Sequence, residues 1–233
     1  MRRFQYRFSP IFLCLTCLFI TCLFISNITA GKLSLILGMT LPAAVIVFPI
    51  TYIFGDVLTE VYGYERARLV IWIGLAANLL MSLIFMITVM LPYPQFWTQQ
   101  GAYAAVLGLT PRIVGASMVG YFGGEFANSF VLSKIKVLTK GRCLWVRTIG
   151  STVVGEAIDT LLFIFLAFAG SLPWGILLGM AGAQYIWKVG YEILATPLTY
   201  RVVGWVKCRE QIDTFDYQTN YNPFHLEEPH GTI

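Results

Sequence analysis

Six long apolar runs divide most of the chain, and short polar or basic stretches separate them. The runs extend from about Pro10 to Ala30, Thr40 to Leu58, Ala67 to Leu91, Pro111 to Leu132, Arg147 to Ala169 and Trp174 to Val203. A helix crosses the hydrocarbon of a bilayer with about 20 mostly apolar residues. The pattern therefore predicts an all-α, polytopic membrane protein with six transmembrane helices in one bundle.

Two stretches outside these runs have a different character. The segment from Pro92 to Thr110 contains prolines, aromatic residues and no charge, which favours an interfacial or re-entrant loop. The C-terminal stretch is polar and contains both histidines, with no paired ligand at metal spacing. We therefore expect a six-helix transmembrane domain at residues 1–209 and a polar, solvated and partly disordered cytoplasmic tail at residues 210–233.

The composition and the distribution of charge also indicate a protein that is surrounded mainly by lipid. Hydrophobic residues make up 57% of the 233 positions and charged residues 12%, whereas about a quarter of the residues of a soluble domain are charged. Thirteen basic residues fall on one side of the six-span arrangement: Arg2, Arg3, Arg7, Arg66, Arg68, Lys134, Lys136, Lys140, Arg142, Arg147, Arg201, Lys207 and Arg209. Cytoplasmic loops are enriched in such residues, so we expect both termini in the cytoplasm and no nucleic-acid partner.

The sequence contains no motif for catalysis and no ligand set for a cofactor or a metal. It lacks HExxH, GxSxG and Walker-type motifs, and no histidine lies in a predicted span. Cys14 and Cys17 have CxxC spacing, but they lie in an apolar run without a second pair. We expect a protein that is not an enzyme and that binds neither a cofactor nor a metal.

Charged and amide side chains inside four predicted spans are the strongest functional signal. A charge at the centre of a bilayer costs about 2.5 to 3.5 kcal/mol on insertion scales, so such residues usually face a cavity or a partner. Spacings of three or four residues place them on one face of each helix. The candidates are Asp56 and Glu60, Glu125 and Asn128, Glu156 and Asp159, and Gln184, Lys188 and Glu192. If these faces converge, they enclose a cavity with more carboxylates than cations.

Two of these sets also have a purely structural interpretation. The acids of the second span could pair with Arg66 and Arg68 as an anchor at the membrane interface. Lys188 could pair with Glu192 one turn away. We favour a cavity acid as its partner, because Lys188 is the one clear base among several clustered carboxylates. The polar residues of the fourth and fifth spans have no nearby base, which favours a functional role.

Small residues at four-residue spacing predict close helix packing. Gly120 and Gly124 form one GxxxG pattern, and Gly175 and Gly179 form another. Such patterns let two helix backbones approach each other closely. Close packing is the ordinary explanation, although the first pattern, together with Ala116, could also dock a partner protein.

A set of motifs relates the chain to a known family. It comprises Phe48 to Tyr52, Gly55 to Tyr64, Arg66 to Arg68, Ile71-Trp72, Asn78, Glu125, Asn128, Lys134, Lys136, Gly155-Glu156, Asp159, Lys188, Asp216-Tyr217 and Thr219 to Phe224. In these residues the chain resembles the queuosine precursor transporter family, also called the vitamin uptake transporter family. The resemblance covers most of the chain from Leu41 to Phe224.

The resemblance implies a multi-pass transporter of the bacterial inner membrane that imports queuosine precursors. These are 7-deazaguanine bases such as the 7-cyano or 7-aminomethyl forms, or queuine. Such a small-molecule deazapurine presents adjacent N–H donors to which a carboxylate of Glu125, Glu156 or Asp159 could bind. Asn128 and Gln184 could then recognise its carbonyl and ring nitrogens. The choice of acid, the substrate form, the coupling ion and homo-oligomer formation stay open at this point.

Two other classes of function compete with a carrier. One is the substrate-binding subunit of an energy-coupling-factor type importer, whose ATPases would be separate chains. The other is a structural scaffold in the membrane, whose acids would be salt-bridged around a sealed interior. Membrane lipid is an expected partner in all three cases.

Overall fold

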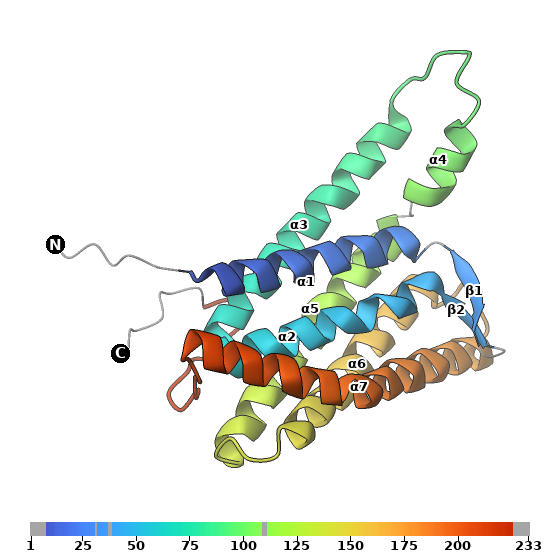
Figure 1. Cartoon of the computed structure of the whole chain (residues 1–233). Coiled ribbons are helices and arrows are strands. Elements are labelled where there is room, and N and C mark those ends of the chain that lie inside the picture. Colours follow the sequence, from blue (N-terminus) through green and yellow to red (C-terminus); the bar gives the residue numbers. More distant parts are fainter. Residues whose placement is uncertain (1–7, 31, 37–38, 109–110, 226–233) are drawn as a thin grey trace.

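The chain folds into a helical bundle (Figure 1), and the computed structural model describes residues 8–30, 32–36, 39–108 and 111–225. Within these residues the helices are α1 (Pro10–Thr29), α2 (Phe48–Tyr62), α3 (Tyr64–Met90), α4 (Gln100–Leu107), α5 (Pro111–Leu138), α6 (Leu144–Phe168) and α7 (Trp174–Glu210). Between α1 and α2, strand β1 (Leu33–Ile36) pairs antiparallel with β2 (Met39–Pro42), and a short 3₁₀ helix, η1 (Ala43–Ile46), follows. The predicted all-α membrane fold is confirmed.

Four segments in the described part of the chain are long and apolar enough to cross a membrane. They are Pro10–Thr29, Tyr64–Met90, Leu144–Phe168 and, including α5, Gln100–Leu138. The predicted boundaries of the second span are wrong. Thr40 and the seven residues after it form β2, η1 and a turn, and α2 begins only at Phe48. The proline at the first turn of α2 suits a helix start, because the missing N–H would have no partner there.

Helix α2 is short and lies inside the bundle. It packs against α1, α3, α5 and α7, and nearly every residue from Thr51 to Tyr62 is buried. It ends at Gly63, whose φ of 85° suits a residue without a side chain. The helix that carries two of the candidate acids is therefore enclosed by protein.

Glycines bring α5 and α6 together. A Cβ added at Gly124 would lie 2.6 Å from the Cβ of Asp159, and one added at Gly155 would lie 2.7 Å from the Cβ of Asn128. The first GxxxG pattern is thus used for packing inside the chain, which corrects its alternative assignment to a partner protein. Gly175 and Gly179 have open space on their side of α7, so the packing predicted there is absent from the described residues.

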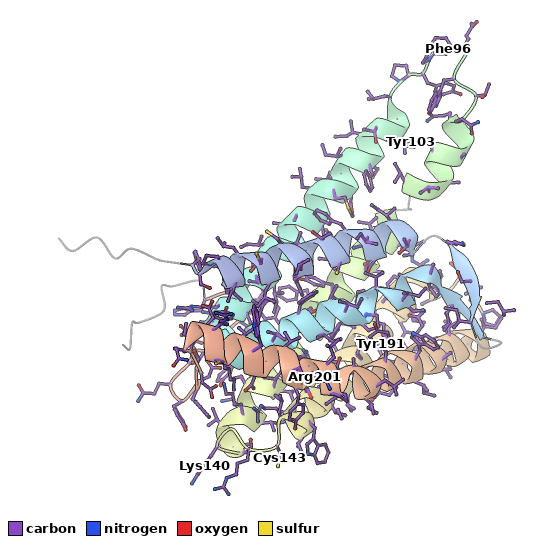
Figure 2. The ribbon with its side chains drawn as sticks, viewed as in Figure 1. Phe96, Tyr103, Lys140, Cys143, Tyr191 and Arg201 are labelled. Atoms are coloured by element: carbon purple, nitrogen blue, oxygen red, sulfur yellow. The ribbon has the colours of Figure 1, made fainter. Side chains whose placement is uncertain are left out.

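The segment predicted as an uncharged loop contains a helix. The C-terminal half of α3 extends beyond the bundle, and α4 folds back beside it (Figure 1). Gln100 Nε2 donates to the carbonyl of Val89 over 2.9 Å, which joins the two helices. Phe96 lies at the tip of this extension, far from Lys140 and Cys143 in the turn between α5 and α6 (Figure 2).

The described part of the tail, residues 211–225, forms specific contacts with the helices, which the sequence did not predict. The Asp216 carboxylate accepts hydrogen bonds from the backbone N–H of Tyr64, at 3.1 and 3.2 Å, and from Ser133 Oγ at 2.6 Å. Arg68 donates to two backbone carbonyls of the tail, one of them that of Asn220 at 2.8 Å. The tail thus joins the start of α3 to the end of α5. His230 lies outside the described residues.

Candidate functional site

A cavity of about 720 Å³ lies at the end of the bundle where α1 ends and α7 begins. Parts of α1, α3, α5, α6 and α7 line it, together with β2 and η1. Aliphatic and aromatic side chains make up most of its wall, including Phe48, Tyr121 and Phe163. An apolar pocket with a few convergent polar groups is typical of a small-molecule site.

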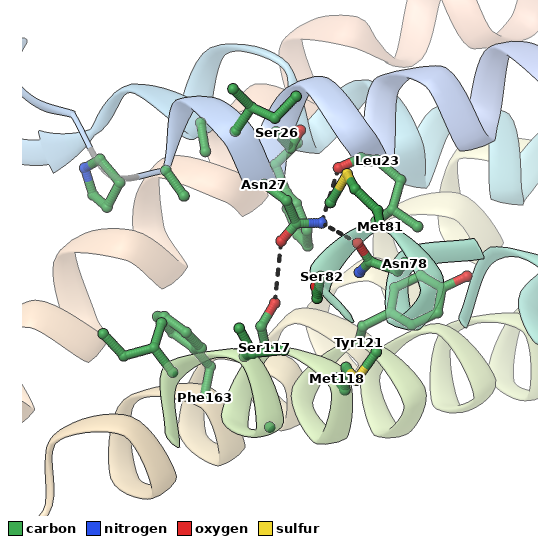
Figure 3. Close-up of a pocket in the computed structure, with 18 of the residues that line it drawn as sticks. Leu23, Ser26, Asn27, Asn78, Met81, Ser82, Ser117, Met118, Tyr121 and Phe163 are labelled. Atoms are coloured by element: carbon green, nitrogen blue, oxygen red, sulfur yellow. Dashed lines mark hydrogen bonds between the residues drawn. The ribbon is translucent and has the colours of Figure 1, made fainter. Parts of the chain in front are cut away.

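One set of polar groups in the cavity joins three helices (Figure 3). Asn27 Nδ2 donates to Asn78 Oδ1 at 3.0 Å and to the Leu23 carbonyl at 3.0 Å. Ser117 Oγ donates to Asn27 Oδ1 at 3.4 Å. The three side chains come from α1, α3 and α5, so they hold these helices in register around the cavity.

The second set of polar groups is an ion-pair cluster on α6 and α7. Lys188 Nζ lies 2.7 Å from Glu156 Oε2 and 2.6 Å from Asp159 Oδ2. The same ammonium lies 4.3 Å from the centre of the Phe48 ring, a favourable cation–π position. Asp159, Gln184 and Lys188 line the cavity. The structure thus pairs Lys188 with Asp159, which lines the cavity, and with Glu156, rather than with Glu192 on its own helix.

A second layer of acids lies behind the cavity wall. Asp56 Oδ1 accepts a hydrogen bond from Asn128 Nδ2 at 2.7 Å. Both carboxylate oxygens of Glu125 and of Glu192 are buried without a hydrogen-bond partner in the described structure. The polar faces of α2 and α5 meet at Asp56 and Asn128, and those of α6 and α7 meet at Lys188. Asp56, Glu125, Asn128 and Glu192, however, are not among the residues that line the cavity.

Glu60 belongs to a separate cluster nearer the end of the bundle where α1 begins and α7 ends. Its carboxylate receives two hydrogen bonds from Arg147, at 2.6 and 2.8 Å, and one from Lys207 at 2.5 Å. Lys136 Nζ lies 3.5 Å away. Burial raises the pKa of the neighbouring Asp213, but hydrogen bonds from Lys136 and Lys207 outweigh it and hold that pKa below its usual value.

Arg66 and Arg68 are therefore not the partners of the span-two acids, which corrects the anchor interpretation. Arg68 donates to the tail, and Arg66 lies over the Tyr62 ring. Both arginines belong to α3, which begins directly after Gly63. The chain turns at that glycine, so these side chains do not lie beside Glu60 on α2. Cations from three distant segments fill that position instead.

Helical register arranges these groups as layers along the bundle. On α2, Phe48, Asp56 and Glu60 lie on one face, and on α7 Lys188 and Glu192 are one turn apart. From the end of the bundle where α7 begins to the end where it stops, the cavity comes first and the Lys188 cluster second. The layer of Asp56 and Glu192 follows, and the Glu60 cluster is last. The cavity is therefore closed toward the end of α7 by charged and polar side chains.

Sequence reasoning missed several residues of the cavity. Asn27 is the one amide in the apolar run Pro10–Thr29, and this isolated polar residue was a signal that could have identified it. Phe48 precedes Asp56 by two turns on the same helix face, so the spacing that identified the acids could also have found it. Ser117 gave no signal, since a serine in a membrane helix is common.

Comparison with known proteins gives two kinds of relationship. Residues 42–202, more than half of the chain, match the family described as "Putative vitamin uptake transporter". A Bacillus subtilis (strain 168) protein named "Probable queuosine precursor transporter" is 25% identical over 176 residues, which are 75% of this chain and 77% of that protein. An Escherichia coli (strain K12) protein named "Queuosine precursor transporter" is 29% identical over 121 residues, 52% of each chain. No solved structure matches.

The matched region includes all nine candidate residues, from Asp56 to Glu192. Asn27 and residues 211–225 of the tail lie outside it. The ion-pair and acid layers thus lie in the part of the chain that is shared with the family.

Proposed function

This chain belongs to the vitamin uptake transporter family, and we propose that it imports queuosine precursors into the cytoplasm. The names of the two relatives support this choice of substrate. The observation that carries the proposal is the cavity with the Asp159 and Lys188 ion pair in its wall. It combines a carboxylate, an ammonium and amides with aromatic faces, which suits a planar, polar heteroaromatic base.

The cavity narrows the set of residues that recognise the substrate. Of the nine candidates, Asp159, Gln184 and Lys188 line it. In the proposed complex, the Asp159 carboxylate accepts the adjacent N–H groups of a 7-deazaguanine ring, while Gln184 and Lys188 donate to its carbonyl and ring nitrogens. Phe48 and Tyr121 supply aromatic faces beside the ring.

The substrate forms under this proposal remain the 7-cyano and 7-aminomethyl bases and queuine. Glu156 and Asp159 together carry one more charge than Lys188 neutralises. A cationic 7-aminomethyl group would gain from this negative excess, whereas the neutral 7-cyano form would depend on hydrogen bonds and stacking. The same excess disfavours an anionic substrate.

The proposed direction follows from the layers. Basic residues at the end of the bundle where α7 ends favour a cytoplasmic location for that end in a bacterial inner membrane. The cavity is at the opposite end, where a substrate would enter from outside. The ion pairs of Glu60 then close the route to the cytoplasm.

The test is uptake by cells that cannot make queuosine, with and without this chain, scored by queuosine in tRNA. Wild type should restore queuosine when a precursor is supplied, and failure with every precursor would contradict the function. Asp159→Asn and Glu156→Gln should abolish uptake but not insertion. Glu65→Gln, a partly exposed acid at the start of α3, is the matched control. Normal uptake by both variants would remove these acids from the site.

One observation favours the substrate-binding subunit of an energy-coupling assembly as a second candidate function. The glycines Gly175, Gly179 and Gly182 have open space beside α7, and a partner helix could approach there closely. Co-purification of ATPase subunits with the chain would support this alternative. Uptake by the purified chain alone in liposomes would contradict it.

A further inference from the structure

Two buried carboxylates behind the cavity, those of Asp56 and Glu192, form no ion pair with a cation in the described structure. Asp56 is 0% exposed and Glu192 is 1% exposed. Asp56 Oδ2 and both carboxylate oxygens of Glu192 have no hydrogen-bond partner in the described structure. The amide of Asn128 is bound to Asp56 by its nitrogen, and its buried oxygen is likewise without a partner.

The cations of the interior are already engaged elsewhere. Lys188 lies against Glu156 and Asp159. The cations of the Glu60 cluster lie against Glu60 and Asp213. Among the described residues no cation forms an ion pair with Asp56 or Glu192. They therefore gain no compensation from a neighbouring positive charge.

The charged groups that face this pair are acids. Glu60 from α2, Glu125 from α5 and Glu192 from α7 act on Asp56. Glu192 lies one turn of α7 beyond Lys188, whose ammonium is already bound to Glu156 and Asp159. A buried ionised carboxylate among other acids is strongly disfavoured, and such a group becomes neutral by binding a proton.

We propose that Asp56 and Glu192 form a proton-binding site that couples transport to the proton gradient, a step that rests on the proposed transport function. The proton resides on one of these carboxyl groups. The side chain of Asn128, which already binds Asp56, has a buried oxygen that is available as an acceptor. The described residues contain no group of three His, Cys, Asp or Glu side chains that could hold a metal ion instead.

The position of the pair suits this role. Glu192 follows Lys188 by one turn of α7, and Asp56 precedes Glu60 by one turn of α2, so each step is about 6 Å along the helix. The site thus lies between the substrate cavity and the ion-pair cluster that closes the route to the cytoplasm. A proton enters from the cavity side. It leaves when the Glu60 cluster opens and the carboxylates meet cytoplasmic water.

The experiment uses purified full-length chain in liposomes and radiolabelled 7-cyano-7-deazaguanine, which is neutral. Counterflow, the exchange of labelled for unlabelled base without a gradient, measures binding and translocation. Accumulation under an inward proton gradient of one pH unit, with the membrane potential clamped at zero, measures coupling. For one proton per substrate, wild type should concentrate the base about tenfold.

Substitution of the pair should separate these two activities. Asp56→Asn and Glu192→Gln lie outside the cavity and should retain counterflow, but their accumulation ratio should fall to about one. Glu65→Gln, the control, should keep both activities. Two independent variants are used so that poor insertion of one leaves the other as the test. If neither inserts, wild-type accumulation under the pH gradient decides.

Each other outcome has a defined meaning. Absence of counterflow by wild type with every precursor would contradict the transport function itself. Counterflow without accumulation under the pH gradient would overturn the proton site and leave the transport function intact. Accumulation driven by a sodium gradient alone, or undiminished in both variants, would also overturn it.

Discussion

Replacing Lys188 by Met removes the single cation that lies against two buried acids, Glu156 and Asp159. Methionine has a similar length and fills the same space without a charge. Glu156 and Asp159 would then face each other without the ammonium that lies 2.7 and 2.6 Å from them. We expect a strongly destabilised protein that carries no substrate.

The magnitude follows from the geometry. At about 2.6 Å and an effective dielectric constant of 20, each contact is worth roughly 6 kcal/mol of Coulomb attraction. Most of this is offset by the cost of removing the charges from solvent. Deleting one partner of a buried pair therefore costs about 3–5 kcal/mol. For a chain of this size that corresponds to a melting temperature lower by about 6–20 °C.

The measurement is thermal unfolding in detergent, followed by tryptophan fluorescence, at pH 8 and at pH 5. The loss should be smaller at pH 5, because protons then neutralise the unpaired acids. Adding Asp159→Asn to Lys188→Met should recover part of the stability but no uptake. Glu192→Gln should not destabilise the protein, since it removes an acid that has no cation. A stable Lys188→Met variant at pH 8 combined with an unstable Glu192→Gln variant would refute this assignment of the ion pair.

Three further predictions concern packing, the tail and the topology. Gly155→Val should cost about 1–3 kcal/mol of stability, because its Cβ would lie within 3 Å of α5. Gly175→Val, in open space, should leave the melting temperature unchanged. Asp216→Ala should cost about 1–3 kcal/mol by leaving the buried backbone N–H of Tyr64 without an acceptor. An unchanged melting temperature would contradict the anchoring of the tail. In a cysteine-free background, an impermeant thiol reagent should label Phe96→Cys but not Lys140→Cys from outside intact cells, and the reverse would overturn the orientation.

The helical class and the helix faces that carry the acids could be predicted because both depend on periodicity. An apolar run long enough to cross a bilayer must form a helix to satisfy its backbone hydrogen bonds, since lipid offers no hydrogen-bond partner to an exposed backbone. Acids at spacings of three or four residues share a helix face whatever surrounds the helix. The ion-pair partners of Lys188 could also be predicted, because a single base among clustered interior acids has few other groups with which to pair.

The partners of Glu60 and the course of the tail depended on segments far apart in sequence. Arg66 and Arg68 were the nearest cations to Glu60 along the chain, but the turn at Gly63 directs α3 away from that face of α2. Arg147 and Lys207 reach the acid only because α6 and α7 pack beside α2. Polar tail residues looked solvated, since their partners on α3 and α5 lie about 80 to 150 positions away.

The sequence by itself determined that the chain is a helical membrane protein, which faces of its helices are polar, and the family to which it belongs. It did so because composition, spacing and motifs are properties of short segments. Only the tertiary structure decided which of those polar residues border the cavity and which lie behind it. Helix spacing and rotation set that division, and they follow from glycine contacts, ion pairs and tail hydrogen bonds between segments that local sequence does not relate.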